Sequence, residues 1–248
     1  MRRIVVIGAG VVGASLAFRL AQAGQAVVLL DSAEPGWGTT GSSFAWTNSN
    51  TKTPEDYFAL NVAGMRAWGE LRDELGDAPW YSEGGNLAWI VGDDGGRLEA
   101  QVARLRAWSY PVEWLSRAEM ADLEPALRVE DDVEQGVYFP TESWVDGPAM
   151  ARAMADEARK HGAEVHVASQ VTAIERDGGR ISGVQLANGE RIAADLVANC
   201  AGPAADAIAR LAGRELPLAP TRGLIVRASH ASGQVRRIVH TPRVHLRP

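Results

Sequence analysis

Short apolar runs and longer amphipathic stretches alternate along this 248-residue chain. Residues 3–7 form a β-branched run, which is typical of a strand buried in a parallel sheet. Residues 14–23 have the apolar spacing of a helix, and Gly24 is expected to end it. Residues 26–30 predict a second buried strand, so the chain opens with a strand–helix–strand unit.

The glycines between the first strand and the helix follow the spacing G-x-G-x-x-G. Gly8 permits a tight turn, Gly10 lets the backbone approach a pyrophosphate, and Gly13 lets the helix pack closely on the strand. Asp31 ends the second strand, where a carboxylate accepts hydrogen bonds from a ribose and repels the 2′-phosphate of NADP. The pattern therefore predicts a site for a dinucleotide, either FAD or NAD.

The next segment, residues 35–50, reads PGWGTTGSSFAWTNSN and carries no charge. An ordinary NAD-binding dehydrogenase would begin another strand–helix unit here, whereas this composition predicts a long polar loop. A flexible surface loop is the alternative interpretation, but two tryptophans within it favour a flat ligand. The loop thus favours FAD, with hydroxyl donors at Thr39, Thr40, Ser42 and Ser43, and with Phe44, Ala45 and Trp46 against a flat ring.

The middle of the chain predicts further helices and strands. Ser116 and Glu119 have the spacing of a capping box at the start of one helix. The longest helix is expected over residues 53–75, with an apolar core stripe of Leu60, Gly64, Trp68, Leu71 and Leu75. The other expected elements are a strand pair within residues 80–91, helices over 96–107 and 116–123, and strands over 136–140 and 239–246.

The chain is expected to return to the first sheet after residue 143. Asp146 as an N-cap and Pro148 in the first turn predict a helix over residues 149–161. The turn sequences Asp-Gly-Gly and Asn-Gly that follow are typical of β-hairpins. The strands expected here are residues 163–168, 171–175, 181–186, 190–193 and 195–199, the last leading into a second glycine turn at residues 200–203.

These segments together resemble the D-amino-acid oxidase-like FAD-dependent oxidoreductases, a family that includes glycine oxidases, sarcosine oxidases and D-amino-acid dehydrogenases. The matching pieces are VVIGAGVVGASLAFRLAQAGQAVVLLD, GTTGSSFAWTNSN, the β-meander, DLVANCAGPAA and PTRGLIVR, so the resemblance covers essentially the whole chain. It implies an α/β fold: a Rossmann-like FAD-binding domain with a β-meander crossover, plus an incomplete α+β substrate domain with a mostly antiparallel sheet. The implied FAD-binding domain is residues 1–79 and 144–216, and the implied substrate domain is residues 80–143 and 217–248.

The resemblance also implies a reaction and a cofactor site. The reaction is oxidation of the C–N bond of a small amine or amino acid (a D-amino acid, glycine or an N-methyl amino acid) by hydride transfer to FAD. Oxygen or a quinone would be the electron acceptor, and no catalytic residue is marked by the sequence. The implied cofactor contacts are Gly8, Gly10, Val11, Val12, Gly13, Asp31, Ser32, Thr39, Thr40, Ser43, Ala45, Trp46, Val171, Ala201 and Gly202.

Composition and charge limit the classes of partner, the compartment and the bound metals that we expect. The net charge of −6 disfavours nucleic acid as a partner. Cys200 is the only cysteine, which excludes an intramolecular disulfide and fits the cytoplasm, with the inner-membrane periphery as the alternative for a dehydrogenase. The five histidines have no metal-binding spacing. The apolar run that follows Arg2 and Arg3 is interrupted by glycines, so a signal peptide is not expected. No apolar run reaches the roughly 18 residues that a membrane span needs, so a membrane anchor is not expected either.

Three alternative functions stay open at this point. One is oxidation of a 2-hydroxy acid on the same fold, and another is an NAD-dependent dehydrogenase. The third is an inactive remnant, or a subunit completed by a partner chain or an oligomer, because the family normally continues past the position of Pro248 with a last glycine-rich segment. A substrate carboxylate would need an arginine, and Arg222, Arg227, Arg243 and Arg247 are available, although each is more often solvated or structural.

Overall fold

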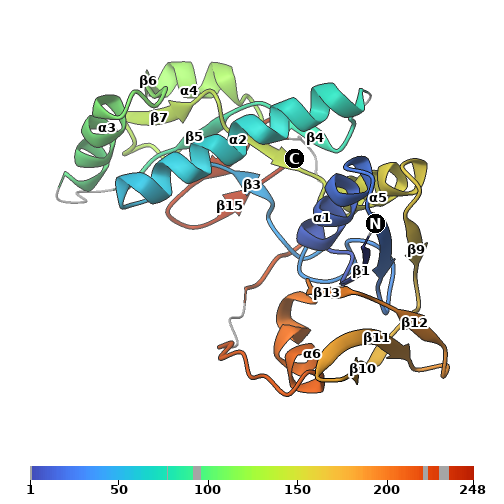
Figure 1. The fold of residues 1–248 in the computed structure, drawn as a ribbon. Coiled ribbons are helices and arrows are strands. Elements are labelled where there is room, and N and C mark those ends of the chain that lie inside the picture. Colours follow the sequence, from blue (N-terminus) through green and yellow to red (C-terminus); the bar gives the residue numbers. More distant parts are fainter. Residues whose placement is uncertain (1, 77, 92–95, 220–222, 229–234) are drawn as a thin grey trace. The chain divides into compact units, whose positions relative to one another are not determined.

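The computed structural model describes residues 2–76, 78–91, 96–219, 223–228 and 235–248. The chain divides into two compact units, and Figure 1 labels the helices and strands that form them. Unit 1 comprises Met1–Ser43 and Asp146–Ile225, and unit 2 comprises Phe44–Val145 and Val226–Pro248. Each unit is therefore built from two separate stretches of sequence.

The centre of unit 1 is a four-stranded parallel sheet with the strand order β13-β1-β2-β9. The predicted opening strand–helix–strand unit is confirmed as β1-α1-β2. The predicted cap is also confirmed, because Asp146 accepts a hydrogen bond from Ala149 N at the start of α5. Helices α1 and α5 lie side by side in both ribbon views. The bounds are β1 Arg3–Ile7, α1 Val11–Gln22, β2 Ala26–Leu30, α5 Gly147–Lys160, β9 Glu164–His166 and β13 Leu196–Asn199.

The other part of unit 1 is the predicted β-meander, β10-β11-β12, whose strands pair antiparallel. Its apolar side chains share one buried cluster with alternate residues of the parallel sheet, because side chains on a strand alternate between faces. The cluster comprises Val5, Ile7, Val28 and Leu30 from the sheet with Val171, Val184, Leu186 and Ile192 from the meander. The bounds are β10 Val171–Asp177, β11 Arg180–Leu186, β12 Arg191–Ala193, η1 Gly202–Ala204 and α6 Ala205–Leu211.

Unit 2 contains two mostly antiparallel sheets. The larger has the order β15-β14-β5-β7-β6, in which only β14 and β5 pair in parallel. The smaller has the order β3-β8-β4. The bounds are β3 Trp46–Thr47, β4 Tyr81–Glu83, β5 Asn86–Ala88, β6 Glu113–Ser116, β7 Gln135–Phe139, β8 Ser143–Val145, β14 Ile238–His240 and β15 His245–Leu246.

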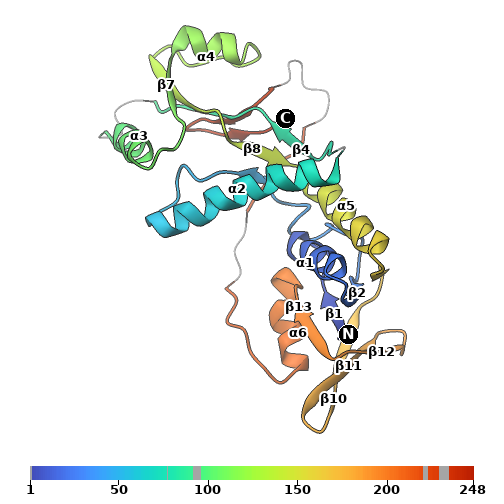
Figure 2. The ribbon, with the colours of Figure 1, turned by 45° about the horizontal axis from the view of Figure 1, so that its top comes forward.

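Helices cover both faces of the larger sheet of unit 2, as Figure 2 shows for α3 and α4. Helices α2 (Glu55–Leu75) and α3 (Arg97–Ala107) supply Phe58, Leu98, Val102 and Leu105 to a cluster with Val137 and Phe139 of β7. Helix α4 (Arg117–Leu123) packs Met120 on the opposite face against Leu87 and Val239. Its capping box at Ser116 and Glu119 is confirmed. The described residues thus form a mixed α/β fold that includes a parallel sheet.

The core stripe predicted for α2 is wrong at several positions. Leu60 is 68% exposed and Gly64 is also exposed, and Phe58, which the stripe left out, is only 6% exposed. Leu71 is buried as predicted. The buried face follows Phe58, Val62 and Met65, which are spaced by four and three residues and so lie on one side of a helix. The sequence pattern fitted two overlapping stripes, and only packing against β7 and α3 selects between them.

Two strand predictions also need correction. The pair expected within residues 80–91 does not exist, because β4 pairs with β8 while β5 pairs with β7 and β14. The strand expected over residues 239–246 is a short antiparallel pair, β14 and β15, joined by a turn in which Thr241 N–H donates to the Val244 carbonyl at 3.0 Å. The Pro242 residue in this turn cannot donate to a sheet ladder.

The compact units also differ from the domain boundaries expected from the sequence. Residues 44–79, expected with the FAD-binding part, lie in unit 2 because Phe58 and Met65 of α2 pack against the α3 and β7 core. The next boundary lies at 145/146, close to the expected position at 143/144. The last boundary lies at 225/226, nine residues beyond the expected position at 216/217.

Candidate functional site

The glycine turn of unit 1 leaves no room for side chains at two of its three positions. Gly8 has a φ of +103°, and a Cβ there would lie 2.3 Å from the carbonyl oxygen of Cys200. A Cβ on Gly13 would lie 1.7 Å from the Gly8 carbonyl oxygen. A Cβ on Gly10 would meet only the Thr40 hydroxyl, at 3.1 Å. Gly8 and Gly13 are therefore required by the fold, whereas Gly10 leaves space in front of the helix.

The N-terminus of α1 adjoins this space. Val11 N–H donates to Thr40 Oγ1 at 3.0 Å, so one of the free donors of the helix end is already satisfied. Within the described residues, the N–H groups of Val12 and Gly13 make no hydrogen bond. Open N–H groups at a positive helix end, next to a residue without a side chain, fit one phosphate pair of a dinucleotide.

Asp31 has a second role that the sequence did not reveal. Its carboxylate accepts hydrogen bonds from Ala9 N at 2.6 Å and from Ala33 N at 2.9 Å. The carboxylate thereby joins the glycine turn to the end of β2. A carboxylate has about four lone-pair positions, so two remain for other donors such as ribose hydroxyls.

The first part of the predicted polar loop, residues 35–43, packs against the rest of unit 1. Gly36 N–H donates to the Ala9 carbonyl at 3.0 Å, and a Cβ on Gly36 would lie 2.7 Å from Pro148 Cα. A Cβ on Gly147 would lie 2.5 Å from the Thr40 carbonyl oxygen. The loop therefore packs between the glycine turn and the start of α5, and glycines make both approaches possible.

The structure brings some predicted cofactor residues together and separates others. Ala201 lies beside the turn, because its Cα is 3.0 Å from a Cβ placed on Gly8. Val171 is buried in the meander core, which leaves only its backbone available to a ligand. The remaining predicted contacts in unit 1 are exposed, at Ser32, Thr39, Ser43 and Gly202, whereas Ala45 and Trp46 belong to unit 2.

Unit 2 contains a buried polar cluster centred on Glu142, which is only 1% exposed. Its Oε1 accepts hydrogen bonds from Tyr110 Oη at 2.7 Å and from Asn50 Nδ2 at 2.9 Å. Its Oε2 accepts from Trp46 Nε1 at 2.8 Å. Burial raises the pKa of Glu142 to about 7, and the hydrogen bonds from Tyr110, Trp46 and Asn50 oppose that rise.

The donors around Glu142 match an ionised carboxylate. Indole and amide N–H groups can only donate, and the Tyr110 hydroxyl already accepts from Ser49 N at 3.2 Å. Burial raises the pKa of Tyr110, and the charge of Glu142 raises it further. Within the described residues, Glu142 forms no ion pair, so neutral donors alone satisfy it.

An aromatic patch adjoins this cluster. The ring of His240 lies 4.1 Å from Trp46, 4.4 Å from His245 and 5.9 Å from Phe44, measured between centroids. His240 Nδ1 lies 2.7 Å from Asn86 Oδ1. Burial, together with the smaller effect of the neighbouring His245, lowers the pKa of His240 to about 4, so His240 is neutral at neutral pH.

Sequence reasoning missed most members of this cluster. It placed Trp46 near a flat ligand but gave no role to Asn50, Asn86, Tyr110 or Glu142. The cluster comes from four segments that are distant in sequence, around residues 46–50, 86, 110 and 142, so no spacing rule connects them. The one available signal is Glu142 itself, an acidic residue between the apolar strands β7 and β8.

The arginines proposed for a substrate carboxylate have partners of their own where they are described. Arg247 Nη1 donates to the Val145 carbonyl at 2.7 Å, and Arg243 Nε lies 4.0 Å from Glu130. Arg227 is exposed, and Arg222 lies outside the described residues. No arginine therefore stands out as the carboxylate ligand in the described part of the chain.

Neither a metal-binding group nor a membrane-spanning helix is found among the described residues. They contain no group of three or more His, Cys, Asp or Glu residues arranged to hold a metal ion. None of the helices resolved in them is both long enough and apolar enough to span a bilayer.

Comparison with known proteins identifies clear relatives. The family model described as "FAD dependent oxidoreductase" (DAO) matches residues 3–248. The chain is 27% identical to "Hydrogen cyanide synthase subunit HcnC" of Pseudomonas aeruginosa, over 90% of this chain and 63% of that protein. It is 29% identical to a glycine oxidase of the same organism, over 96% of this chain and 65% of that protein.

Solved structures show the same fold. The crystal structure of glycine oxidase from Geobacillus kaustophilus superimposes with a TM-score of 0.79 at 20% identity, covering 98% of this chain and 67% of that one. The chain spans less than two thirds of the length of the two curated relatives.

Proposed function

The chain belongs to the DAO family of FAD-dependent oxidoreductases, and from this we propose that it binds FAD in unit 1 and takes part in oxidising the C–N bond of a small amine or amino acid. The observation that carries the proposal is the opening at the N-terminus of α1, where Gly10 has no side chain and the N–H groups of Val12 and Gly13 are free among the described residues. Two amine-oxidising families among the relatives, the glycine oxidases and sarcosine oxidases, support the substrate class.

In this proposal, the residues of unit 1 bind and orient the cofactor. Val12 and Gly13 N–H donate to the pyrophosphate, and the free lone pairs of Asp31 accept from the adenosine ribose. The other expected contacts in unit 1 are Gly8, Val11, Ser32, Thr39, Thr40, Ser43, Val171, Ala201 and Gly202. The expectation for Ala45 and Trp46, which belong to unit 2, rests on the family resemblance alone.

The chemistry itself comes from the cofactor. When bound, FAD supplies the acceptor for a hydride from the carbon next to the substrate nitrogen, which leaves an imine that water hydrolyses. The protein residues contribute binding, orientation and exclusion of water.

Flavin absorbance of the purified chain tests cofactor binding directly. The chain should hold FAD, either as purified or after addition of FAD and dialysis. Gly10→Val should abolish retention while leaving the unfolding curve close to wild type, because the added side chain enters the phosphate space and meets only the Thr40 hydroxyl. Gly38→Ala is the matched control, since a Cβ there meets nothing within 4 Å.

Anaerobic loss of flavin absorbance then tests the substrate class. Glycine, sarcosine and D-alanine should reduce the bound flavin, and glycolate should not. Retention of FAD with reduction only by glycolate would establish 2-hydroxy acid oxidation in place of amine oxidation. A chain that never retains FAD would contradict the proposal at its first step.

A further inference from the structure

The hydroxyl of Tyr110 lies between two hydrogen-bond acceptors but has only one proton to donate. Its Oη is 2.7 Å from Glu142 Oε1 and 3.6 Å from Met65 Sδ. It also accepts from Ser49 N at 3.2 Å. A charged carboxylate is a stronger acceptor than the sulfur of a thioether. While Glu142 is ionised, the Tyr110 proton therefore points to Glu142.

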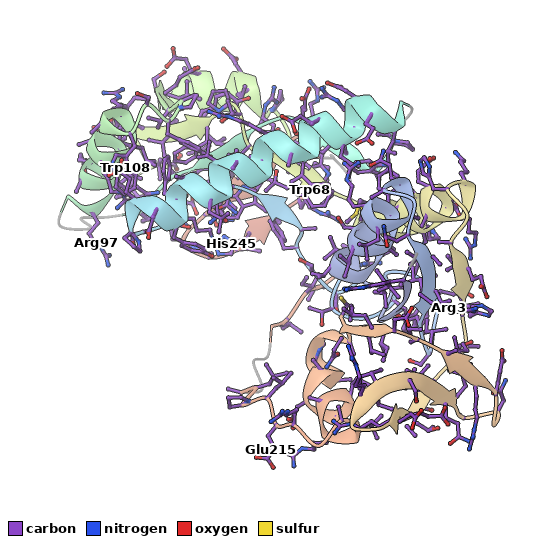
Figure 3. All side chains as sticks on the ribbon, viewed as in Figure 1. Arg3, Trp68, Arg97, Trp108, Glu215 and His245 are labelled. Atoms are coloured by element: carbon purple, nitrogen blue, oxygen red, sulfur yellow. The ribbon has the colours of Figure 1, made fainter. Side chains whose placement is uncertain are left out.

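The ring of Tyr110 is held in place by other aromatic rings, so its hydroxyl hydrogen can turn without moving the ring. Tyr110 is buried and lies two positions after Trp108, the residue at the end of α3 that Figure 3 labels. The Phe58 ring lies 4.8 Å from Trp108 and 5.5 Å from Tyr110, measured between centroids. The Phe139 ring lies 6.4 Å from Tyr110. Both acceptors thus remain within reach of one fixed oxygen atom.

The other two donors to Glu142 restrict where a proton can be added. Trp46 Nε1 donates to Oε2 at 2.8 Å, and Asn50 Nδ2 donates to Oε1 at 2.9 Å. The Asn50 amide cannot turn over, because Gln101 Nε2 donates to its Oδ1 at 3.3 Å and to its backbone carbonyl at 3.2 Å. Indole and amide nitrogens only donate, whereas a hydroxyl can also accept. The proton must therefore bind Oε1 on the side of Tyr110, and that oxygen keeps a lone pair for Asn50.

We propose that Glu142, Tyr110 and Met65 form a pH-sensitive switch in unit 2, in which a proton taken up at Glu142 Oε1 turns the Tyr110 hydroxyl from Glu142 to Met65 Sδ. The proton comes from solvent and forms one O–H bond on Glu142, which then donates to Tyr110 Oη. The O–H bond of Tyr110 rotates but does not break. The hydrogen bonds from Trp46 and Asn50 remain, so the buried carboxyl group is satisfied in both charge states.

The switch exchanges one connection within unit 2 for another. Met65 lies on α2, and Glu142 lies between β7 and β8. Tyr110 therefore donates to the β7–β8 connection when Glu142 is ionised and to α2 when Glu142 is protonated. Burial raises the pKa of Glu142 to about 7, which places this change near neutral pH.

Other charged or titratable groups face this cluster from α3, β4, β14 and β15. Arg104 of α3 donates to the Asn50 carbonyl at 3.1 Å and stays positive throughout. Tyr81 of β4 binds the residue that follows Glu142. Burial and the nearby His245 of β15 lower the pKa of His240 on β14 to about 4, so His240 stays neutral near pH 7. The test must therefore separate Glu142 from His245.

Methyl NMR of the chain labelled with 13C-methyl methionine tests the turn of the Tyr110 hydroxyl directly. The chain has five methionines, and Met65→Leu identifies the Met65 signal. In wild type, this signal should shift with a midpoint near the Glu142 pKa of about 7, because the sulfur gains a hydrogen bond as Glu142 takes up its proton. In Tyr110→Phe and in Glu142→Gln, the signal should not shift over this range.

Met120 and His245→Gln provide the matched controls. Met120 is a fully buried methionine on the opposite face of the same sheet, so its methyl signal should stay constant from about pH 6 to 8. His245→Gln removes the other imidazole and should keep the Met65 titration of the wild type. A titration that disappears in His245→Gln, or that persists in Tyr110→Phe, would show that the Tyr110 hydroxyl is not the moving group.

The carboxyl signal of Glu142 measures uptake of the proton itself. In chain labelled with 13C at the glutamate carboxyl carbon, Glu142→Gln identifies this signal, which should titrate in wild type at the pKa of about 7. Met65→Leu keeps the side-chain volume but removes the sulfur acceptor. It should lower the midpoint by about half a pH unit, a roughly threefold loss of proton affinity, and Met120→Leu should leave the midpoint unchanged. Equal midpoints in Met65→Leu and wild type would contradict the role of Met65.

The switch and the proposed function fail separately, because none of these measurements uses FAD. A Glu142 carboxyl that stays ionised down to about pH 5, or that titrates with no shift of the Met65 signal, would overturn the switch and leave FAD binding untouched. Loss of the Trp46 indole N–H signal below the midpoint would show that the cluster opens when the proton binds. A chain that does not retain FAD, yet shows both titrations, contradicts the proposed function and supports the switch.

Discussion

The glycine turn of unit 1 and the Glu142 cluster of unit 2 are built in opposite ways. The turn uses backbone N–H groups and the lack of side chains at Gly8, Gly10 and Gly13, all within one short segment. The cluster uses side chains contributed by segments at Trp46, Asn50, Asn86, Tyr110 and Glu142. The first is local in sequence, and the second exists only after unit 2 has folded.

This difference has a physical consequence. Backbone groups at a helix end are positioned by the helix itself, so a local pattern suffices to create the site. A buried carboxylate must gather enough donors to offset the loss of water, and those donors can come from anywhere in the fold. The two sites should therefore respond differently to substitution.

The largest effect is expected at Gly13. Gly13→Ala places a Cβ 1.7 Å from the Gly8 carbonyl oxygen, which is backbone and cannot move aside without opening the turn. Overpacking of this kind costs about 3 kcal/mol or more, so unfolding by urea should begin at clearly lower concentration. Gly38→Ala, in open space, should change the free energy of unfolding by under about 0.5 kcal/mol. Equal stability of the two variants would show that the turn tolerates a side chain.

Removal of the Glu142 carboxylate is the matching test in unit 2. Glu142→Leu leaves three donors without their acceptor, and at about 1 kcal/mol each the loss should approach 3 kcal/mol. Urea unfolding measures this loss, and Glu134→Gln on the exposed surface is the control, with an expected change under about 0.5 kcal/mol. A Glu142→Leu variant as stable as wild type would mean that the desolvation of the carboxylate costs as much as its hydrogen bonds contribute.

The pH dependence of stability separates the two regions further. Burial raises the folded-state pKa of Glu142 to about 7, above the ordinary value of 4.5, so the folded chain holds a proton more strongly than the unfolded chain. Stability from this group is therefore highest below about pH 4.5 and falls as the pH rises to about 7, by up to about 3 kcal/mol.

The measurement is the difference in free energy of unfolding between wild type and Glu142→Gln at several pH values from 4.5 to 7. Using a difference removes the opposite contribution of His240, whose lowered pKa makes the chain less stable as the pH falls from about 6.5 to 4. A difference that does not change with pH would show that the pKa of Glu142 is not raised.

The smallest effect is expected at Thr40. Thr40→Val keeps the shape of the side chain but removes the acceptor for Val11 N–H, so it should cost about 1 kcal/mol, as the loss of a helix cap does. Thr40→Ser retains the hydroxyl and should be closer to wild type. If Thr40→Val and Thr40→Ser have the same unfolding free energy, the Val11–Thr40 hydrogen bond contributes nothing to stability.

The sequence predictions were right for features that neighbouring residues determine, and wrong for features that depend on tertiary packing. The strand–turn–helix at residues 3–22, the cap at Asp146 and the hairpins of the meander were all predictable, because each depends on neighbouring residues. Leu60 was misassigned to the core, because the helix pattern allowed two faces and only β7 and α3 choose between them. The apparent pair of β4 and β5 was wrong for the same reason, since each strand finds its partners elsewhere in the chain.

Asp31 combines both kinds of information. Its position at the end of β2 followed from the sequence, but its hydrogen bonds to Ala9 and Ala33 appear only in three dimensions. Local patterns determined where the backbone turns and where its free N–H groups lie, because helix and strand geometry are set within a few residues. Tertiary packing alone decided that Glu142 meets Trp46, Asn50 and Tyr110, because burial brings together polar groups that must satisfy one another away from water.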